Sequence, residues 1–542
     1  MRVCQLLLWG LFFLPFAGTS QSFTDSNLPI VLINTRGATI VNEPKIVGDL
    51  RIIDNGVGKR NALTDKASFS SVIGIELRGA TSQDFFPKKP YGLELRDSTG
   101  VNSVAKSVLG MPAESDWVFN AVYNDKTLVR EMLTYDFYRK MSPYYASRFR
   151  YCELMLNGEY RGIYLVMERL KRDKNRVNIS SIKKTDLTGD ALTGGYILKI
   201  DKTEGSASRS WTSSYAAGPN RLPLKIQIDR PKPEDLAEEQ FQYIKQYVTD
   251  FENALNGPDF ADPVQGFRKF ADENSFIDYL LLTEICKNVD GYRLSAFFYK
   301  DRDSKSPHLV MGPIWDYNLT YGNANYCNGN DSRGWAFDFN AVCPKDVYQI
   351  PFWWNRLLQD LAFGRKVKER YKTLRQTILT PQRLGTFVDS TTTALTEARG
   401  RNFIKWPVIG VYVWPNWYVG ATYQAEVGYL KQWIENRLNW MDTAIESFGV
   451  LPLATEPNAL RLGPNPSVGD ILLTLPLPAA TDVSLTLTDM QGRLLHQVQY
   501  GNHPAGTFER VLSMSVFSRA PGTYLLTLTT QSGPVSKIIV RY

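Results

Sequence analysis

Short apolar runs separated by polar and turn-forming residues make up most of the first half of the chain. Runs of about four to eight residues bounded in this way are typical of β-strands. We therefore predict strands at 30–33, 48–53, 72–77, 91–95, 151–156, 162–167 and 196–200. Between them, apolar residues recur at helical spacing over 126–141, which predicts one helix with Asp125 as its N-cap.

Beyond residue 230 the spacing of apolar residues becomes helical. It predicts helices over 234–255, 275–287, 352–361, 366–379, 381–398 and 426–448. A β-rich half followed by a helical half indicates an α+β fold with two lobes, and a cleft between such lobes would suit a nucleotide.

After a Pro-containing segment, short alternating runs return and predict a small C-terminal β-sandwich. The expected parts are a signal peptide at 1–20, a β-rich lobe at 21–230, a helical lobe at 231–449, a linker at 450–460 and the sandwich at 461–542.

Two aspartates flank a predicted β-hairpin in the second half. The apolar runs 296–299 and 309–311 are separated by a charged turn, with Asp290 before the first run and Asp316 after the second. An antiparallel hairpin brings its ends together, so both carboxylates can face one small volume. Phosphoryl transfer needs such a pair, one carboxylate to orient a hydroxyl and one to hold Mg²⁺. On spacing alone, two acids that merely flank a surface hairpin remain an open alternative.

Composition and charge narrow the class of protein. With 542 residues, 43% of them hydrophobic and 22% charged, the chain is long enough for several globular domains. Its net charge of +7 comes from interspersed rather than clustered basic residues, which gives no support for nucleic-acid binding. Residues 1–20 have the pattern of a secretory signal peptide, and no later run is apolar enough to predict a transmembrane helix. We therefore expect an exported protein.

The cysteines and histidines favour a disulfide over a metal site. Cys327 and Cys343 enclose 15 residues, and an oxidising compartment would allow a bridge worth about 3 kcal/mol between them. Cys152 and Cys286 lie in apolar stretches of the sequence, so we expect both to be buried. The three histidines are far apart in the sequence, so zinc ligation and a Ser-His-Asp triad are poorly supported. Glycine-rich loops of the Rossmann or P-loop type are also lacking in the sequence.

Charged clusters in the first half could bind phosphates, and each has an ordinary structural explanation as well. The turn that begins at Arg78 ends in the adjacent Lys88 and Lys89, and a solvated basic turn explains it too. Lys126 and Arg130 crowd a predicted helix N-terminus, where a cap with surface charges would look the same. Several tryptophans in the second half could stack on sugars, although packing is their commoner use.

Taken together, these segments resemble the spore coat protein H family, the CotH kinases. The resemblance covers roughly residues 28–445, in the expected order. The matching segments are Arg78-Gly, Phe86-Pro-Lys-Lys-Pro-Tyr91, Asp116-Trp-Val-Phe-Asn120, Tyr123-Asn-Asp-Lys-Thr-Leu-Val-Arg130, Asn157-Gly-Glu-Tyr-Arg-Gly-Ile-Tyr164, Met167-Glu-Arg-Leu-Lys-Arg-Asp-Lys-Asn-Arg-Val177, Gly194-Gly-Tyr-Ile-Leu198, Asn288-Val-Asp-Gly291 and Gly312-Pro-Ile-Trp-Asp-Tyr-Asn318.

The resemblance implies a divergent protein-kinase-like fold that uses ATP with Mg²⁺ or Mn²⁺. By position, Asp290 would orient the substrate hydroxyl and Asp316 would bind the metal. One position departs from ordinary kinases, because Ser295 stands where they carry a metal-binding asparagine, and Asn318 or water would fill that role. The phosphate-binding candidates are Lys89, favoured over Lys88, with Glu168 as its possible acidic partner, and in second rank Arg78, Lys126 and Arg130.

The terminal domain resembles the C-terminal sorting domain of the type IX secretion system, through Leu462-Gly-Pro-Asn-Pro-Ser467 and Ala520-Pro-Gly-Thr-Tyr-Leu525. This resemblance implies recognition by the secretion machinery and a location outside the cell or at its surface. The leading hypothesis is therefore a secreted atypical kinase that phosphorylates Ser or Thr of an exported protein. The alternative is a non-catalytic surface protein of the same fold that binds a glycan or a protein partner.

Overall fold

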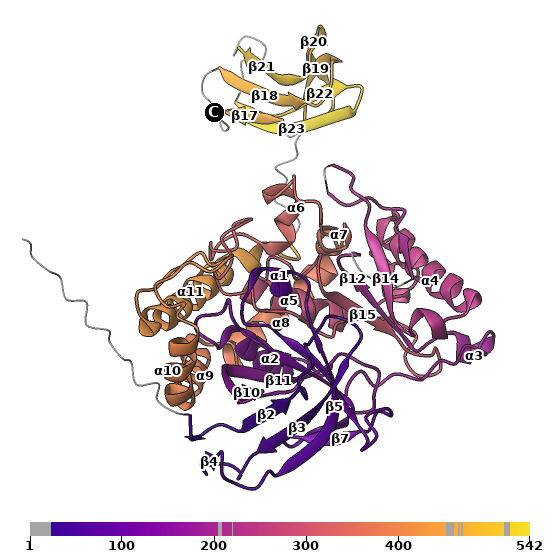
Figure 1. Cartoon of the computed structure of the whole chain (residues 1–542). Coiled ribbons are helices and arrows are strands. Elements are labelled where there is room, and N and C mark those ends of the chain that lie inside the picture. Colours follow the sequence, from indigo (N-terminus) through magenta and orange to yellow (C-terminus); the bar gives the residue numbers. More distant parts are fainter. Residues whose placement is uncertain are drawn as a thin grey trace, which may run out of the picture. The chain divides into compact units, whose positions relative to one another are not determined.

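The chain folds into two compact units, residues 1–449 and 450–542, in a computed structural model. The structure describes residues 23–203, 209–218, 220–450, 460–463, 465, 467, 470–513 and 521–541. The expected signal peptide and most of the expected linker lie outside these residues. Together the units give a mixed α+β fold with all-β sheets after the helical region (Figure 1).

Seven strands of the first unit close into a barrel in the order β10-β11-β9-β6-β5-β3-β2. Their bounds are β2 Ile30–Asn34, β3 Ile46–Ile53, β5 Phe69–Leu77, β6 Tyr91–Arg96, β9 Asp116–Asn120, β10 Phe149–Leu156 and β11 Glu159–Glu168. The barrel closes because β10 runs parallel to β2, with Glu153 opposite Ile30, while the other neighbours are antiparallel. Apolar residues from alternate positions fill its interior. Two small ribbons accompany the barrel, β1 Asp25–Ser26 with β4 Asn61–Ala62 and β7 Lys106–Val108 with β8 Met111–Glu114.

A second sheet of the first unit has the order β13-β14-β12-β15-β16. Its strands are β12 Tyr196–Ile200, β13 Ser210–Thr212, β14 Lys225–Arg230, β15 Ala296–Lys300 and β16 Leu309–Met311. The predicted hairpin is confirmed, since β15 pairs antiparallel with β16. Strands β12 and β14 join the same sheet, and one apolar core extends from Leu28 to Phe448. Residues before and after the expected lobe boundary at 230 therefore belong to the same sheet and the same core.

Helices lie beside the five-stranded sheet and beside β10 and β11 of the barrel (Figure 1). They are α1 Thr81–Phe85, α2 Arg130–Met141, α3 Gly189–Leu192, α4 Glu238–Asn256, α5 Glu273–Cys286, α6 Phe339–Val342, α7 Trp353–Gln359, α8 Leu361–Thr377, α9 Pro381–Ala394, α10 Thr396–Lys405 and α11 Tyr423–Ala444, with 3₁₀ turns at Pro233–Asp235, Phe267–Lys269, Ala336–Asp338 and Ile445–Ser447. In the parts of the chain that the structure covers, no helix is both long enough and apolar enough to cross a membrane.

The helix α2 begins later than the sequence predicts. The Asp125 carboxylate accepts hydrogen bonds from the backbone N–H groups of Thr127 and Arg130, at 3.0 and 2.8 Å. These bonds hold residues 125–129 in a non-helical turn, and the helix starts at Arg130 with Val129 in the N-cap position. Asp125 thus organises the entry to the helix without being its N-cap.

The helix α5 carries the chain toward the hairpin. It is buried nearly all round, which fits the predominance of apolar residues in Phe276–Cys286, and it contacts α2, α8, α11 and β16. It ends at Lys287, whose φ of 45° lies in the left-handed region. The chain therefore turns sharply and reaches Asp290 within one short loop.

The second unit consists of two antiparallel sheets, β17-β18-β21 and β20-β19-β22-β23. Their strands are β17 Arg461–Gly463, β18 Ile471–Leu477, β19 Thr481–Asp489, β20 Leu494–His503, β21 Gly506–Leu512, β22 Gly522–Thr530 and β23 Gly533–Arg541. Alternate residues of both sheets, such as Leu473 and Leu485, form one core, as in a β-sandwich. This unit thus has an apolar core of its own.

Candidate active site

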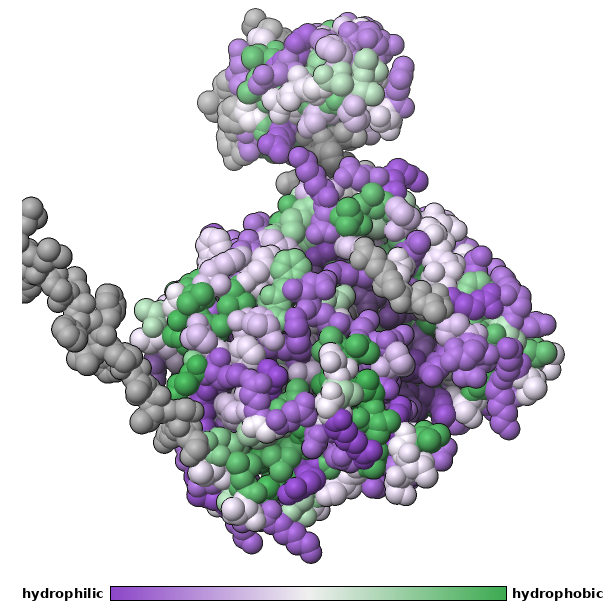
Figure 2. All heavy atoms as spheres, viewed as in Figure 1, coloured by the Kyte–Doolittle hydropathy of each residue, from purple (hydrophilic) through white to green (hydrophobic). Residues whose placement is uncertain are grey.

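Three aspartates gather at one edge of the five-stranded sheet. Ile200 at the end of β12 lies opposite Ala296 at the start of β15, and Met311 at the end of β16 lies opposite Phe298. Asp201 therefore follows β12 where the Asp290 loop enters β15, and Asp316 follows β16 at the same edge. In Figure 2 a hollow with mainly hydrophilic walls lies beside β12 and β15.

The side chain of Asp316 is exposed to solvent on one side and surrounded by protein on its others. Burial raises the pKa of Asp316 to about 6, and the neighbouring carboxylates of Asp290 and Asp201 act in the same direction. Its φ of 60° lies in the left-handed region, which few residues other than glycine and asparagine or aspartate adopt. The carboxylate of Asp316 is thus held close to other negative charges that repel it. Such an arrangement favours binding of a cation.

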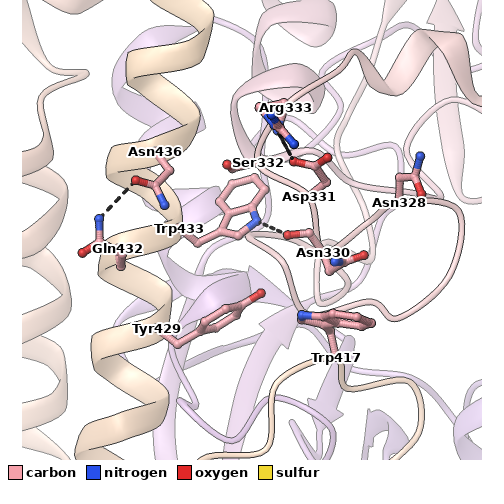
Figure 3. A pocket seen from close by; sticks show the side chains of 10 residues that line it. All are labelled: Asn328, Asn330, Asp331, Ser332, Arg333, Trp417, Tyr429, Gln432, Trp433 and Asn436. Carbon is pink, nitrogen blue, oxygen red and sulfur yellow. Dashed lines mark hydrogen bonds and ion pairs between the residues drawn. The ribbon is translucent and has the colours of Figure 1, made fainter.

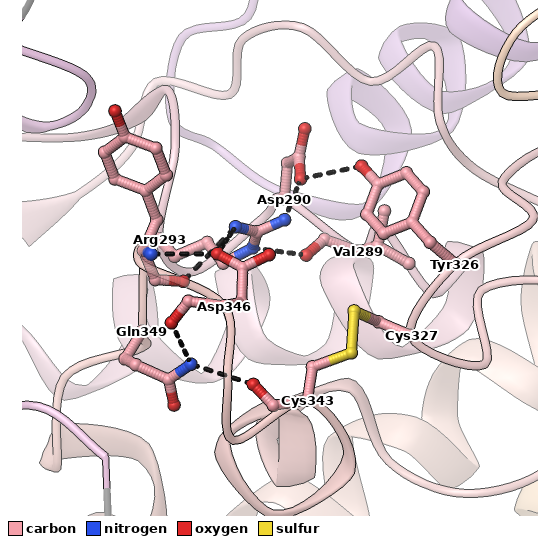
Figure 4. Close-up of a disulfide and its surroundings, with 9 residues drawn as sticks. Val289, Asp290, Arg293, Tyr326, Cys327, Cys343, Asp346 and Gln349 are labelled. Atoms are coloured by element: carbon pink, nitrogen blue, oxygen red, sulfur yellow. Dashed lines mark hydrogen bonds and ion pairs between the residues drawn. A yellow bond between two sulfur atoms is a disulfide. The ribbon is translucent and has the colours of Figure 1, made fainter. Parts of the chain in front are cut away.

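One oxygen of Asp290 is fixed and the other is left open. Arg293 donates from Nη2 to Oδ1 of Asp290 at 2.6 Å, and the Tyr326 hydroxyl donates to the same oxygen at 3.1 Å (Figure 4). Oδ2 accepts no hydrogen bond from the residues that the structure describes. Figure 4 shows this second oxygen directed away from the Arg293 and Tyr326 side chains. The anchored carboxylate thus presents one free acceptor.

A disulfide-closed loop is flanked by residues that hold Asp290 and Arg293. The bridge between Cys327 and Cys343 predicted from the sequence is present, with the two Cα atoms 5.5 Å apart. Tyr326 precedes Cys327 directly, and Asp346, just beyond Cys343, accepts from Nη1 of Arg293 at 3.1 Å. Arg293 thereby binds the carboxylates of both Asp290 and Asp346. Its guanidinium also lies over the Phe339 ring, 4.2 Å from the centroid.

Two cations face Asp316, and their charges lower its pKa: Arg78 after β5 and Lys202 after β12. The Arg78 guanidinium lies over the ring of Trp315 at 5.0 Å. Burial lowers the pKa of Arg78 to about 10, the charge of Arg169 acts in the same direction, and that of Asp316 opposes them. Lys202 donates to the Thr81 hydroxyl at 3.1 Å. Arg78 and Lys202 would therefore attract an anion to a position beside the aspartates.

A buried glutamate of α2 also approaches Asp316. Burial raises the pKa of Glu131 to about 8, and the Asp316 and Asp125 charges act in the same direction. The Asn120 side chain donates to its carboxyl group at 2.6 Å. At neutral pH Glu131 is therefore largely protonated, so it adds little negative charge to the site. Sequence reasoning missed this residue because it lies within an ordinary-looking amphipathic helix.

Four of the basic residues singled out in the sequence already have partners within the protein. Lys88 is only 1% exposed and donates to the Ile163 carbonyl at 2.6 Å and to Asn402 at 2.9 Å. Burial lowers the pKa of Lys88 to about 7. Lys126 and Arg130 are equally buried, and they pair with acids of their own: Lys126 with Glu426 at 3.7 Å and Arg130 with Asp125 at 2.7 Å. Lys89 is half-buried and donates to the Gln83 carbonyl.

The expected pair of Lys89 and Glu168 is wrong. Glu168 is fully buried and accepts two hydrogen bonds from the Arg148 guanidinium, at 2.8 and 3.0 Å, and a third from the Tyr145 hydroxyl. Both guanidinium bonds reach Oε1, and the Arg148 backbone N–H and the Tyr145 hydroxyl donate to Oε2, so both oxygens of Glu168 are already bound. Glu168 therefore ties β11 to the start of β10 as a structural ion pair.

The oxygen donors near Asp316 suit a hard divalent cation. No group of three or more His, Cys, Asp or Glu residues that could hold a metal ion occurs among the residues described. Mg²⁺ that binds together with a nucleotide needs only one or two carboxylates, since phosphates and waters complete its shell. Asp316 fits such a site, with the half-buried Asn318 two residues further on, whose amide donates to Asn124 at 3.5 Å. The Ser295 side chain is half-buried at the entry to β15.

A comparison with known protein families matches most of the first unit. Residues 75–441 match the family model described as CotH kinase protein. The match begins in β5 and ends in α11, so it includes Arg78, all three aspartates and the disulfide-closed loop. No curated protein matches the chain.

Proposed function

The chain belongs to the CotH kinase family, and we propose that it is a secreted or cell-surface atypical kinase that transfers the γ-phosphoryl group of ATP to a Ser or Thr hydroxyl of an exported protein. The observation that carries the proposal is the pair of carboxylates at one sheet edge, Asp290 with a free oxygen and Asp316 crowded by negative charge. Phosphoryl transfer depends on positioning and on neutralising charge, and this pair supplies a group for each task.

On the acceptor side, Asp290 orients the substrate hydroxyl and accepts its proton through Oδ2. Because Arg293 and Tyr326 both bind Oδ1, the carboxylate cannot rotate without breaking two hydrogen bonds. A base held in this way keeps the hydroxyl oxygen aligned with the γ-phosphorus, which lowers the entropic part of the barrier.

On the donor side, Asp316 would hold the divalent cation, with Asn318 as a second oxygen donor. Mg²⁺ or Mn²⁺ would supply charge neutralisation on the phosphates, and it would relieve the repulsion that raises the pKa of Asp316. Ser295 replaces the asparagine of ordinary kinases, and its hydroxyl is a weaker ligand, so we assign that role to Asn318 or to water.

Arg78 and Lys202 are the proposed phosphate cations. Their charges already act on Asp316, and the Trp315 ring under Arg78 supports the guanidinium from one face. Lys89, which belongs to the same segment as Arg78, is retained as a neighbouring candidate that would have to release the Gln83 carbonyl. Lys88, Lys126 and Arg130 are not assigned, because their burial and internal partners keep them from a ligand.

Export is supported by the disulfide, since such bridges persist in oxidising compartments. The second unit is proposed as a sorting domain that the secretion machinery recognises. Its support is the sandwich together with the Pro-Asn-Pro and Gly-Thr-Tyr elements of its sequence.

The test is phosphorylation of the secreted proteome by chain 21–542 with radiolabelled ATP and Mg²⁺ or Mn²⁺. Transfer should occur with the parent and should fall by about a hundredfold or more in Asp290→Asn and Asp316→Asn. Asp389→Asn is the matched control and should behave like the parent, because Asp389 is an exposed aspartate that pairs with Lys431 on the helical surface. Absence of labelled protein with either metal, or equal labelling by all variants, would refute the proposal.

A further inference from the structure

An open cavity of about 460 Å³ lies between the loop 328–333 and the helix α11, with Trp417 at its edge (Figure 3). Its volume is in the range of small-ligand sites. None of its lining residues contributes to the candidate active site, although the loop belongs to the same disulfide-closed segment. The cavity therefore calls for an explanation of its own.

Aromatic side chains form one part of the wall. Trp417 is 54% exposed and lies at the cavity edge, where Figure 3 draws its indole below the opening. Tyr429 of α11 stacks on Tyr418, with centroids 4.4 Å apart and planes 7° from parallel, and its hydroxyl donates to the Gly322 carbonyl. Trp433 is nearly buried, and its indole nitrogen donates to the Asn330 carbonyl at 2.7 Å. The Tyr429 and Trp433 rings are thus fixed before any ligand arrives.

The remaining wall is polar and almost free of net charge. The amides of Asn328 and Asn330 and the hydroxyl of Ser332 make no hydrogen bond to other residues in the described ranges, so they are available to a ligand. Gln432 and Asn436 add a second pair of amides on α11, joined at 3.1 Å. The two charged lining residues, Asp331 and Arg333, bind each other.

The loop that carries these groups is rigid. The buried Arg437 donates to the carbonyls of Ser332 and Gly334 at 3.0 and 2.7 Å. The nearly buried Lys287 donates to the carbonyls of Asp331 and Arg333 at 2.8 and 2.5 Å. Two interior cations thus hold four successive carbonyls, so binding a ligand costs little ordering of the loop.

The chemistry of the wall identifies the class of ligand. A nucleotide or another anion would need an unpaired cation, and the only cation in the lining, Arg333, is taken by Asp331. A lipid or apolar peptide would need an apolar wall, whereas half of the lining residues here carry a side-chain amide or an aliphatic hydroxyl and two more are charged. A sugar has an apolar C–H face, which stacks on an aromatic ring. Its rim carries neutral hydroxyl groups. Amides form hydrogen bonds with such hydroxyls as donors and as acceptors.

From these observations we propose that the cavity is a binding site for a neutral oligosaccharide, with Trp417 as the stacking platform and Asn328, Asn330 and Ser332 as hydrogen-bonding partners. The site is distinct from the phosphoryl-transfer centre and would hold the protein on a glycan. It does not depend on the proposed kinase activity.

The test measures binding of chain 21–542 to neutral cello-, xylo-, manno- and chito-oligosaccharides by calorimetry, with an acidic oligogalacturonide as the charged counterpart. At least one neutral oligosaccharide should bind, and Trp417→Ala should weaken it by about tenfold, the scale of losing one aromatic contact. Asn330→Ala should also weaken it. Tyr412→Ala is the matched control, because Tyr412 is likewise 54% exposed in the same segment but does not line the cavity.

The control and Asp290→Asn should bind like the parent, which separates this site from the kinase proposal. Thermal unfolding of Trp417→Ala should match the parent, since the side chain is largely at the surface. Three outcomes would overturn the proposal: no binding of any neutral oligosaccharide, binding that survives Trp417→Ala unchanged, or binding of the acidic oligosaccharide alone.

Discussion

Replacing both cysteines of the Cys327–Cys343 disulfide by serine should destabilise the first unit by about 3 kcal/mol. The bridge closes a loop with a sequence separation of 16, and the loop-closure entropy lost by the unfolded chain gives about 3 kcal/mol at 25 °C. Both cysteines are half-buried, so serine fits the same space and can reach solvent. The loss should therefore arise mainly from the missing cross-link.

Urea unfolding followed by tryptophan fluorescence isolates this effect. The 12 tryptophans of the chain all precede residue 450, so the signal reports the first unit alone. The unfolding midpoint should fall, and the free energy extrapolated to water should fall by about 3 kcal/mol. The parent treated with dithiothreitol should show the same loss, because Cys152 and Cys286 are buried and unpaired and have no bridge to lose.

The disulfide should also affect catalysis, because it joins the segment next to Tyr326, which binds Asp290, to the segment that leads to Asp346, the second partner of Arg293. The double serine variant should lose kcat while keeping its affinity for ATP, since Arg78 and Lys202 lie on other segments. An unchanged unfolding midpoint would refute the entropic argument. An unchanged kcat would refute the view that this loop positions Asp290.

Three further predictions concern single residues. Burial raises the pKa of Glu252 to about 7 from an ordinary 4.5, so its neutral form contributes stability that is complete below about pH 4.5 and is lost as the pH rises through about 7. Glu252→Gln should abolish that loss of about 3 kcal/mol, as measured by urea unfolding at about pH 4 and pH 8, and an equal pH slope in both proteins would contradict this. Tyr326→Phe should lower kcat about tenfold at constant KM for ATP in steady-state assays, because it removes one hydrogen bond to the Asp290 carboxylate, and a change in KM alone would argue against a positioning role. Arg78→Met should raise KM for ATP about tenfold in the same assay, while Arg51→Met, an exposed arginine on β3, should leave it unchanged.

The hairpin could be predicted from the sequence, but the residues that the neighbouring strand β12 brings beside it could not. Alternating apolar runs around a charged turn predict the hairpin because the signal is local, and Asp290 and Asp316 follow from it. Asp201 and Lys202 come to the same edge because β12 pairs with β15, which is nearly a hundred residues further along. No local pattern specifies which distant strand becomes a neighbour, so these two residues could not be placed from the sequence.

The burial and the partners of the basic residues could not be predicted for a related reason. Lys88 and Lys89 are adjacent in the sequence but differ in burial, and only Lys89 has partial access to solvent. Lys126 and Arg130 meet buried acids, and the partner of Lys126 comes from α11. A charged side chain in a sequence is taken to be exposed unless its partner is known, and such a partner can lie hundreds of residues away. The Glu168 pairing was missed on the same ground.

The central claim is that Asp290 and Asp316 have different tasks, and calorimetric titration of ATP with Mg²⁺ into the two asparagine variants tests it most directly. Asp290→Asn should bind ATP and Mg²⁺ as the parent does, although its phosphoryl transfer falls by about a hundredfold or more. Asp316→Asn should lose the part of the ATP affinity that depends on the metal. Equal metal-dependent affinity in the parent and Asp316→Asn, or loss of that affinity in Asp290→Asn, would contradict the account.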